Sequence, residues 1–200
     1  LIFLFPWILN KSLAFYARIT TYRHIRFRFT GTYWPAFKAF FLWPLAAMFT
    51  LMLLMPITIQ RQQTYIANHH NYGNRSFAFN GKVGEYYKIF LISIACVVIG
   101  FIAGYILGLI FPALMAFGVA AGYICSIIYF IVASNNLFFN KLNLADHDFR
   151  ANFDYKDYGL ILIGNFLLTI ITLGLYIPWA KVKLAHYAAE HTAIDVNGDL

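Results

Sequence analysis

The sequence predicts an all-α polytopic membrane protein with about four complete or partial membrane segments plus a truncated N-terminal one, joined by short repeats of β-strand and interfacial helix. The first indication is composition, because 61% of the 200 residues are hydrophobic and 12% are charged, whereas about a quarter of residues are charged in soluble domains. The second is that four charge-free stretches make up half of the chain, residues 1–10, 39–60, 89–133 and 158–180. The third is their continuity, since unbroken apolar runs are typical of membrane helices and not of alternating barrel strands.

The length of each charge-free stretch predicts how often it crosses the bilayer. An α-helix rises about 1.5 Å per residue and the hydrocarbon core is about 30 Å thick. Residues 39–60 and 158–180 are therefore each long enough for one crossing, and residues 89–133 for a hairpin that bends near Pro112. Residues 1–10 resemble the end of a further span. Because no initiating Met or charged leader precedes them, we expect a fragment of a longer protein and not a signal peptide.

Glycines recur every four residues in the first half of the predicted hairpin. Gly100, Gly104 and Gly108 would share one helix face, and Gly118 and Gly122 lie in the second half. Small residues at this spacing let two helix backbones approach closely in lipid. The alternative interpretation is that glycine is simply common in membrane helices, and we favour packing.

The charged loops predict an orientation and raise a conflict. Residues 11–38 hold six basic residues and no acid, and residues 61–88 hold four basic residues and one acid. The positive-inside rule places the first loop in the cytoplasm. A complete span at 39–60 would then place the second basic loop outside. Because prolines interrupt that region, a broken or re-entrant helix is the alternative, and the sequence leaves both open.

An internal repeat is visible in the loops. In two copies a proline is followed 25 residues later by a glycine, with basic and aromatic residues at matching places between them, and the C-terminal segment repeats this scheme in shortened form. The repeat units are roughly residues 6–31, 56–81, 178–198 and a weaker copy at 149–159, within one membrane domain that comprises residues 1–200. Each unit predicts an interfacial helix followed by a short alternating strand of the type FRFTG or FAFNG. We expect such strands to pair across copies in a small extramembrane sheet.

Basic and aromatic side chains of the repeat are candidates for the lipid interface. Trp and Tyr sit at the headgroup level of membranes, and Lys and Arg are attracted to anionic lipids. The candidates are Trp7, Lys11, Arg23, Arg26, Arg28, Arg61, Trp179, Lys181 and Lys183. The expected partners are therefore anionic membrane lipids. The pI near 9.4 could also indicate nucleic acid, which we do not expect next to membrane spans, and homo-oligomer formation stays open.

Four segments carry a resemblance to a known family. They are NFLLTIITLGLYIPWAKVKLAHYAAEHT (165–192) followed by Asn197-Gly198, RHIRFRFTGTYWPAFKAFF (23–41), NHHNYGN (68–74) and NKLNLADHDFRANFDYKDYGLILIGN (140–165). The chain resembles the YjgN-type bacterial inner-membrane proteins, a domain-of-unknown-function family. The resemblance implies a multi-pass protein of a Gram-negative inner membrane that is longer than this chain. It brings no reaction, cofactor or catalytic residue. Pro35 departs from the pattern, because an acidic residue is expected there as at Glu85 and Asp157.

Few residues suggest catalysis. His69 and His70 form one polar cluster and Asp146-His147-Asp148 another, but a metal needs three or four converging ligands and adjacent side chains diverge. His186 and Glu190 share a helix face without the second histidine of a zinc protease. We therefore expect no catalytic, metal or cofactor-binding residue. A membrane-embedded enzyme that uses His69, His70 or His147 is the less favoured alternative.

Polar residues in the last apolar stretch leave a transport function open. Asn165, Thr169 and Thr172 follow the spacing of one helix face, as in a polar path or a helix-packing face. Ion pathways usually contain ionisable residues, and the apolar stretches contain no Asp, Glu, Lys or Arg. We predict an uncharacterised inner-membrane protein with a structural or transport-related role. The alternative is a transporter or channel for a small solute.

Overall fold

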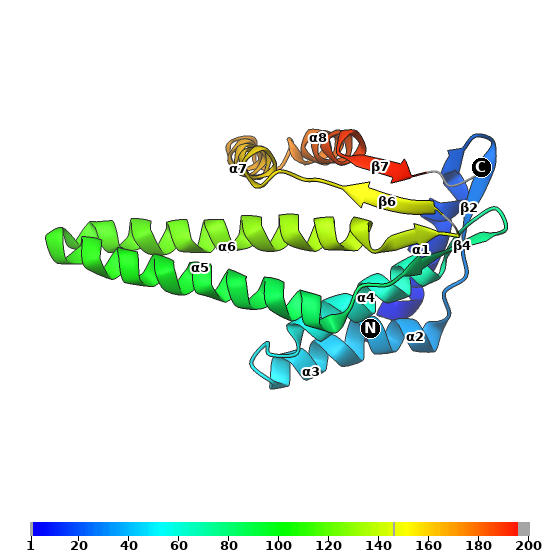
Figure 1. The fold of residues 1–200 in the computed structure, drawn as a ribbon, viewed down its shortest axis with the longest axis horizontal. Coiled ribbons are helices and arrows are strands. Elements are labelled where there is room, and N and C mark those ends of the chain that lie inside the picture. The colour runs from blue at the N-terminus through cyan, green and yellow to red at the C-terminus, as the bar shows by residue number, and fades with distance from the viewer. Residues whose placement is uncertain (1, 146, 196–200) are drawn as a thin grey trace. The chain divides into compact units, whose positions relative to one another are not determined.

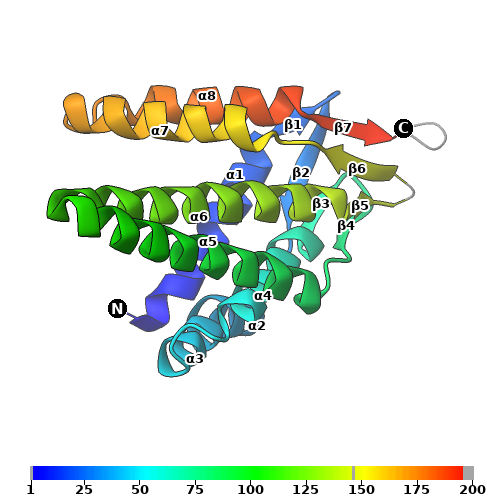
Figure 2. The ribbon, with the colours of Figure 1, turned by 60° about the vertical axis from the view of Figure 1, so that its left-hand side comes forward.

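The computed structural model describes residues 2–145 and 147–195, in which helices alternate with pairs of short strands (Figure 1, Figure 2). The helices are a short 3₁₀ turn η1 (Ile2–Leu4), α1 (Phe5–Ile19), α2 (Tyr33–Phe37), the π-helical η2 (Lys38–Leu42), α3 (Trp43–Phe49), α4 (Met55–Asn68), α5 (Val83–Ile110), α6 (Pro112–Asn140), α7 (Tyr155–Ile171) and α8 (Ile177–Glu190). The strands are β1 (Thr21–Tyr22), β2 (Ile25–Phe29), β3 (His70–Tyr72), β4 (Arg75–Phe79), β5 (Leu142–Leu144), β6 (His147–Ala151) and β7 (Thr192–Asp195).

The prediction of an all-α protein with about four membrane segments is wrong. Seven strands form one sheet in the order β1 to β7. Among the described residues, only α5 and α6 are helices long and apolar enough to cross a membrane. The apolar stretches 39–60 and 158–180 are each divided by a chain reversal, at residues 50–54 and 172–176. Hydropathy alone could not reveal these reversals, because the residues on both sides of each turn are apolar.

The sheet is built from hairpins that each follow a helix. In the first hairpin Tyr22 pairs with Ile25 across a turn in which Arg23 and His24 have φ of 47° and 64°. Two consecutive residues in this left-handed region form the tight turn that matches the twist of antiparallel strands. Each hairpin then pairs antiparallel with the next, β2 with β3 and β4 with β5. The expected pairing of strands from different copies is therefore present.

One backbone hydrogen bond recurs wherever a hairpin meets the next helix. The residue after the second strand donates its N–H to the carbonyl of the residue that follows the last helix of the next helical hairpin. The pairs are Thr30 with His69 at 2.9 Å, Asn80 with Lys141 at 2.9 Å and Asn152 with His191 at 3.1 Å. The hairpins are thus attached to successive helices in the same way three times.

The chain divides into two compact units. The first comprises Leu1–Tyr86, Asn140–Phe149 and Ile194–Leu200, and the second Tyr87–Phe139 and Arg150–Ala193. The first unit holds the paired helices α3 and α4, and the second holds the pairs α5 with α6 and α7 with α8 (Figure 2). The four repeat units and the single domain predicted from the sequence are not tested by this division and stay predictions.

Each unit has a core around a tyrosine, and the two cores are related by a shift of 122 positions. In the first unit Tyr65 packs with Ala36, Ala39 and partly buried neighbours. In the second, Tyr187 packs with Tyr158 and Ile161, which stand 122 positions after Ala36 and Ala39. Each remaining neighbour in the first core also has a counterpart in the second: Phe29, Phe40 and Ile66 correspond to Ala151, Leu162 and Ala188. The second core is larger and also contains residues of α6, among them Val132.

The aromatic ring against each tyrosine comes from a different position of the repeat. Phe29 lies 6.0 Å from the ring of Tyr65, and Phe153 lies 5.9 Å from the ring of Tyr187. Phe153 corresponds to Gly31, where an added Cβ would lie 2.4 Å from the Phe29 ring. The second unit therefore has a small residue followed by a large one, Ala151 and Phe153, where the first has the reverse order. A phenylalanine ring therefore packs against the core tyrosine in both units, from positions two residues apart in the repeat.

Candidate membrane interface

The α5–α6 pair is held together at its glycines. An added Cβ at Gly100 would lie 2.5 Å from Cα of Gly122, and one at Gly104 would lie 2.8 Å from the carbonyl oxygen of Met115. An added Cβ at Gly118 would in turn lie 2.4 Å from Cα of Gly104. Backbone meets backbone at these points, so no larger residue fits without separating the helices. This is the close approach on which helix association in lipid depends.

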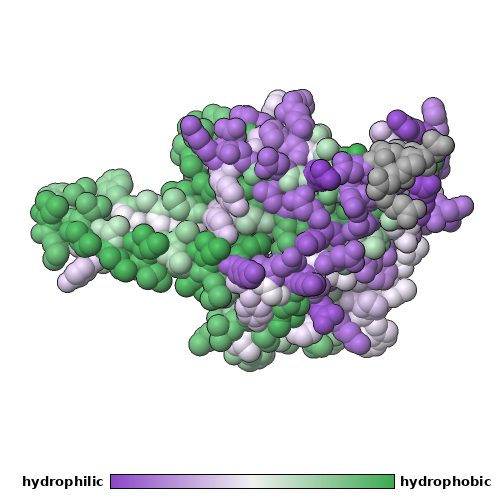
Figure 3. All heavy atoms as spheres, viewed as in Figure 1, coloured by the Kyte–Doolittle hydropathy of each residue, from purple (hydrophilic) through white to green (hydrophobic). Residues whose placement is uncertain are grey.

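The outward faces of the same two helices are apolar and exposed. Leu109, Ile110 and Phe117 are among many large hydrophobic side chains left uncovered there, and Figure 3 shows the surface over α5 and α6 as predominantly green. A soluble protein rarely exposes contiguous apolar surface of this extent. The two helices thus have a glycine seam toward each other and an apolar surface toward the environment.

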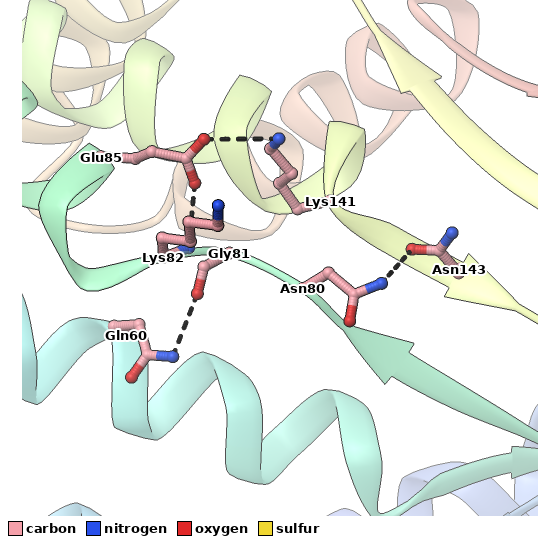
Figure 4. Close-up of polar contacts among 7 residues, drawn as sticks. All are labelled: Gln60, Asn80, Gly81, Lys82, Glu85, Lys141 and Asn143. Carbon is pink, nitrogen blue, oxygen red and sulfur yellow. Dashed lines mark hydrogen bonds and ion pairs between the residues drawn. The ribbon is translucent and has the colours of Figure 1, made fainter.

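The ends of the α5–α6 pair meet in a polar cluster (Figure 4). Glu85, near the start of α5, accepts a 2.9 Å hydrogen bond from the backbone N–H of Lys82 and forms a 3.3 Å ion pair with Lys141, directly after α6. Gln60 donates to the carbonyl of Gly81 at 3.1 Å, and Asn80 donates to Asn143 at 3.3 Å. Sequence reasoning missed this cluster. Its signal was the carboxylate three residues after Lys82, the spacing with which a side chain reaches back to cap a helix.

The predicted interfacial residues lie on several elements. Trp7 and Lys11 share one face of α1, Arg26 and Arg28 follow each other on the same side of β2, and Arg61 lies on α4, while Trp179, Lys181 and Lys183 lie on α8. Three cations lie over aromatic rings: Lys11 at 5.8 Å from Trp7, Arg23 at 5.6 Å from Tyr22 and Arg61 at 5.7 Å from Trp43. The structure therefore brings cations and aromatic rings together in pairs within the first unit, whereas Trp179, Lys181 and Lys183 belong to the second.

A groove lies beside α8 in the second unit. Its volume is about 460 Å³, and its lining includes Ile161, Trp179, Lys183 and Glu190. Trp179 also stacks with Tyr176 at 6.5 Å. A largely apolar lining, with Lys183, His186 and Glu190 as its polar members, suits a partly apolar ligand better than a small polar substrate.

The histidines considered for catalysis form hydrogen bonds with nearby carbonyl groups or with an arginine. Nδ1 of His69 lies 2.8 Å from the carbonyl oxygen of Tyr65, and Nδ1 of His70 lies 2.7 Å from that of Ile66. His147 is buried, and its Nε2 lies 2.8 Å from the Arg75 guanidinium. Asp146 lies outside the described residues. Within the described part of the chain no three His, Cys, Asp or Glu residues lie close enough to hold a metal ion.

The two tyrosines at the cores hold the helix ends with their hydroxyls. Tyr65 donates to Asn10 Oδ1 at 2.6 Å and lies 3.1 Å from the carbonyl of Thr32. Burial raises the pKa of the Tyr65 hydroxyl, against the lowering effect of the bond to Asn10. Tyr187 accepts from the backbone N–H of Asp154 at 3.1 Å. These hydroxyls are structural, since they bond the residues that precede α2 and α7, Thr32 and Asp154, and in the first unit also Asn10 within α1.

The polar residues of the predicted path separate into two roles. Asn165 is buried and donates to the carbonyl of Ala180 at 3.4 Å, and its Oδ1 has no hydrogen-bond partner. Thr172 donates to the carbonyl of Leu168 at 2.7 Å and accepts from the N–H of Tyr176 at 3.1 Å. The Thr169 carbonyl accepts from Gly174 at 2.8 Å. Thr169 and Thr172 thus take part in the chain reversal, whereas Asn165 faces the partner helix.

Comparison with known proteins gives a family and a few relatives. The family described as "Bacterial protein of unknown function (DUF898)" matches residues 1–200. An inner membrane protein YjgN of Salmonella typhimurium is 38% identical over 74 residues, which are 36% of this chain and 18% of that protein. The inner membrane protein YjgN of Escherichia coli K12 is 41% identical over 59 residues, 30% of this chain and 14% of that protein. No solved structure matches.

The matched segments span less than a fifth of the length of these relatives. The predicted resemblance to YjgN-type inner-membrane proteins of uncharacterised function is confirmed at this level. A match over the whole chain, together with relatives named as inner membrane proteins, agrees with the apolar α5–α6 pair. The chain belongs to the DUF898 family of bacterial proteins of unknown function.

Proposed function

We propose that this chain is a membrane-embedded scaffold of a multi-pass bacterial inner-membrane protein, in which α5 and α6 cross the bilayer as a pair and the basic hairpins bind anionic lipid headgroups. The observation that carries the proposal is the backbone contact between Gly100 and Gly122 within two helices whose outer faces are apolar. At about 1.5 Å per residue, 28 and 29 residues reach about 42 Å, which exceeds a hydrocarbon core of about 30 Å.

The ion pair between Glu85 and Lys141 supports an even number of crossings between them. Glu85 lies near the start of α5 and Lys141 directly after α6, and their side chains lie 3.3 Å apart. A chain that leaves at Glu85 and returns to Lys141 has crossed twice, so both flanking segments are on one side. Residues 11–38 carry six basic residues and no acid, which favours the cytoplasm for that side.

The basic residues of β2 are suited to headgroups. Arg26 and Arg28 are exposed and two positions apart, so both point to the same side of the strand. A guanidinium binds a phosphate with two parallel hydrogen bonds. Because anionic lipids are enriched on the cytoplasmic surface, each exposed arginine near it adds roughly 1 kcal/mol to the attraction.

Lipid selectivity in vesicles tests this proposal. The protein is reconstituted with spin-labelled phosphatidylglycerol or spin-labelled phosphatidylcholine, and the motionally restricted fraction of each lipid is measured by electron paramagnetic resonance. We expect a preference for phosphatidylglycerol that falls in the Arg26→Gln, Arg28→Gln double variant and is retained in the Arg26→Lys, Arg28→Lys control. Equal restriction of both lipids by the unmodified protein would contradict headgroup binding.

Transport is the second candidate, and one observation favours it. Asn165 is buried between α7 and α8, and its Oδ1 lacks a partner, a state that costs free energy unless a ligand or water satisfies it. Solute uptake into proteoliposomes that disappears in Asn165→Leu, while α7–α8 remains folded, would favour transport over a scaffold. If the unmodified protein shows no uptake, and Asn165→Leu keeps its helix content but loses stability, Asn165 serves helix packing.

A further inference from the structure

The two chain reversals that divide the apolar stretches are copies of one motif. Residues 50–56 read TLMLLMP and residues 172–178 read TLGLYIP, 122 positions apart. Leu51 and Met52 have φ of 49° and 67°, and Leu173 and Gly174 have φ of 50° and 92°. A left-handed backbone at a leucine is rare and costs of order 1 kcal/mol or more. Its presence at the same place in both copies indicates a turn held by its surroundings.

The same hydrogen bonds close both turns. Four backbone bonds recur with the 122-position shift, in each case N–H to carbonyl. In the first turn they are Thr50 to Ala46, Met52 to Ala47, Leu53 to Thr50 and Met55 to Met52, and in the second Thr172 to Leu168, Gly174 to Thr169, Leu175 to Thr172 and Ile177 to Gly174, all between 2.8 and 3.1 Å. The Thr50 and Thr172 hydroxyls also bond back to the carbonyls four residues earlier, at 3.0 and 2.7 Å.

Together these bonds provide backbone N–H groups of the turns with partners that do not depend on water. In the second turn each of the six consecutive N–H groups from Thr172 to Ile177 donates within the hairpin. In hydrocarbon an unsatisfied backbone group costs several kcal/mol, so a turn that enters lipid needs partners for its N–H groups. An ordinary surface turn has no such requirement, because water bonds its free groups.

The side chains at the two turns are apolar and uncovered. Leu51 is 88% exposed and Leu173 is 94% exposed, and Phe49, Ile171 and Leu175 are also largely exposed. The arms beneath them are held together by one buried polar contact each. Thr58 donates to the carbonyl of Trp43 at 3.1 Å, and Asn165 donates to that of Ala180, at positions that correspond by the same shift. The exposed leucines are thus at the ends of well-packed antiparallel helix pairs.

The nearest tryptophan and the nearest basic residue behind each turn set how far it could enter lipid. Trp43 precedes Leu51 by eight residues, which is about 12 Å of helix, and the Arg61 guanidinium lies over its ring. In the second hairpin Trp179 follows Leu173 by six residues and Lys181 by eight, about 9 and 12 Å of helix. These depths fall short of one leaflet's hydrocarbon, about 15 Å. Tryptophan and basic residues are typical of the headgroup level.

We infer that the α3–α4 and α7–α8 hairpins are two copies of a membrane-insertion device, whose leucine tips at residues 49–53 and 171–175 enter the acyl chains of a single leaflet and return. The occupant is lipid hydrocarbon, because the depth from each tip to its tryptophan and basic residue fits within one leaflet, and because the same chain holds the α5–α6 pair, which is long and apolar enough to cross a membrane. This inference rests on the proposed membrane location of the chain, and it adds two contacts that do not cross the bilayer.

Spin labels at the two tips test the inference. Single cysteines replace Leu51 or Leu173 in a background with Cys96→Ala and Cys125→Ala, and the reconstituted full-length protein is labelled. Accessibility is compared between oxygen, which partitions into lipid, and a water-soluble nickel chelate. We expect oxygen access to exceed nickel access at both tips, at a depth of about 10 Å and less than one leaflet. A label at exposed Ser76 of β4 is the aqueous control.

The outcomes separate this inference from the proposed function. A label at Ile99, which is exposed on α5, reports lipid contact of the spanning pair. If Ile99 lies in lipid while Leu51 and Leu173 are reached by nickel or by neither reagent, the tips lie in water or under another part of the protein and the inference is wrong. If Ile99 is reached by nickel, the membrane scaffold itself is wrong. Labelling of Leu51→Cys from the periplasm by an impermeant thiol reagent would show a complete crossing and overturn the inference.

Discussion

The helical hairpins of the two units have the same plan and differ in their first arm. Residues 155–171 form one continuous helix, α7, whereas the corresponding residues 33–49 form α2, the π-helical η2 and α3. Pro44 stands near the start of α3, and a proline in a helix removes a hydrogen bond and clashes with the preceding turn. The widened turn η2 directly before it accommodates the ring. The reversal and second arm are unchanged, so the insertion motif does not depend on a regular first arm.

The starts of the two first arms differ for a related reason. Asp154 caps α7 by accepting from the N–H groups of Lys156 at 2.8 Å and Asp157 at 3.1 Å. Thr32 stands at the corresponding place before α2 and makes no such bond. Pro35 corresponds to Asp157 and has no N–H to offer. The departure at Pro35 noted in the sequence therefore removes one of the two donors that are capped in the second unit.

Removing the phenylalanine that packs against the core tyrosine should have the largest effect on stability. Phe153 is 2% exposed, so Phe153→Ala should lower the free energy of unfolding by about 3–5 kcal/mol. The double variant Ala151→Phe, Phe153→Gly restores the order found at Phe29 and Gly31 and should recover most of this loss. Unfolding by SDS in mixed micelles measures both. A double variant no better than Phe153→Ala would show that the two cores are not equivalent.

A lysine introduced at a tip should destabilise the protein more than a lysine introduced on the helix surface behind it. Leu173→Lys should destabilise membrane-bound protein by about 2–3 kcal/mol, because a lysine within hydrocarbon is costly, and Leu51→Lys should behave alike. Val182→Lys is the matched control, since Val182 is exposed on α8 between Lys181 and Lys183. SDS unfolding of the protein in bilayer discs measures the difference. Equal effects of Leu173→Lys and Val182→Lys would argue against insertion of the tip.

Within the long helices, a glycine should matter most where two backbones meet. An added Cβ at Gly100 would lie 2.5 Å from Gly122, whereas Gly164 on α7 has no such neighbour within 4 Å. Gly100→Leu should therefore cost about 1–3 kcal/mol, and Gly164→Leu should stay within about 0.5 kcal/mol of the unmodified protein. Unfolding in the same micelles checks this pair. Similar costs at both glycines would mean that α5 and α6 do not depend on their close contact.

The helix cap should give the smallest difference. Asp154→Ala should lower stability by about 1 kcal/mol, because two backbone N–H groups lose their acceptor. Thr32→Ala should change stability far less, since its side chain caps nothing. Helix unfolding followed by circular dichroism compares the two variants. A larger effect at Thr32 would show that Pro35 does not account for the missing cap.

Some of the fold could be predicted because its signal is local. The bend near Pro112 lies where α6 begins, since proline fits the first turn of a helix. The alternating strands of FRFTG and FAFNG are present in β2 and β4, paired across copies. Their number and continuity into one sheet were underestimated, because strands of two to five residues carry little periodicity of their own.

The reversals at residues 50–54 and 172–176 could not be predicted from hydropathy. Leu51 and Met52 are residues that rarely adopt left-handed backbone, and no charge marks the turn. The only available signal was the comparison of TLMLLMP with TLGLYIP, in which Gly174 indicates the conformation that Met52 shares. The predicted repeat units begin at Pro56 and Pro178, the last residues of the two motifs, and therefore do not include the turns.

The central claim is that α3–α4 and α7–α8 enter one leaflet and return. Its most direct test is to determine on which side of the membrane each strand hairpin lies. Single cysteines at His24, Asn74 and Glu190 are exposed to an impermeant thiol reagent from the periplasm, with Phe111→Cys at the α5–α6 turn as the accessible control. We predict that only the control reacts until the membrane is permeabilised, after which all react. Reaction of Asn74→Cys but not His24→Cys from the periplasm would show that residues 39–60 cross the bilayer and would contradict the claim.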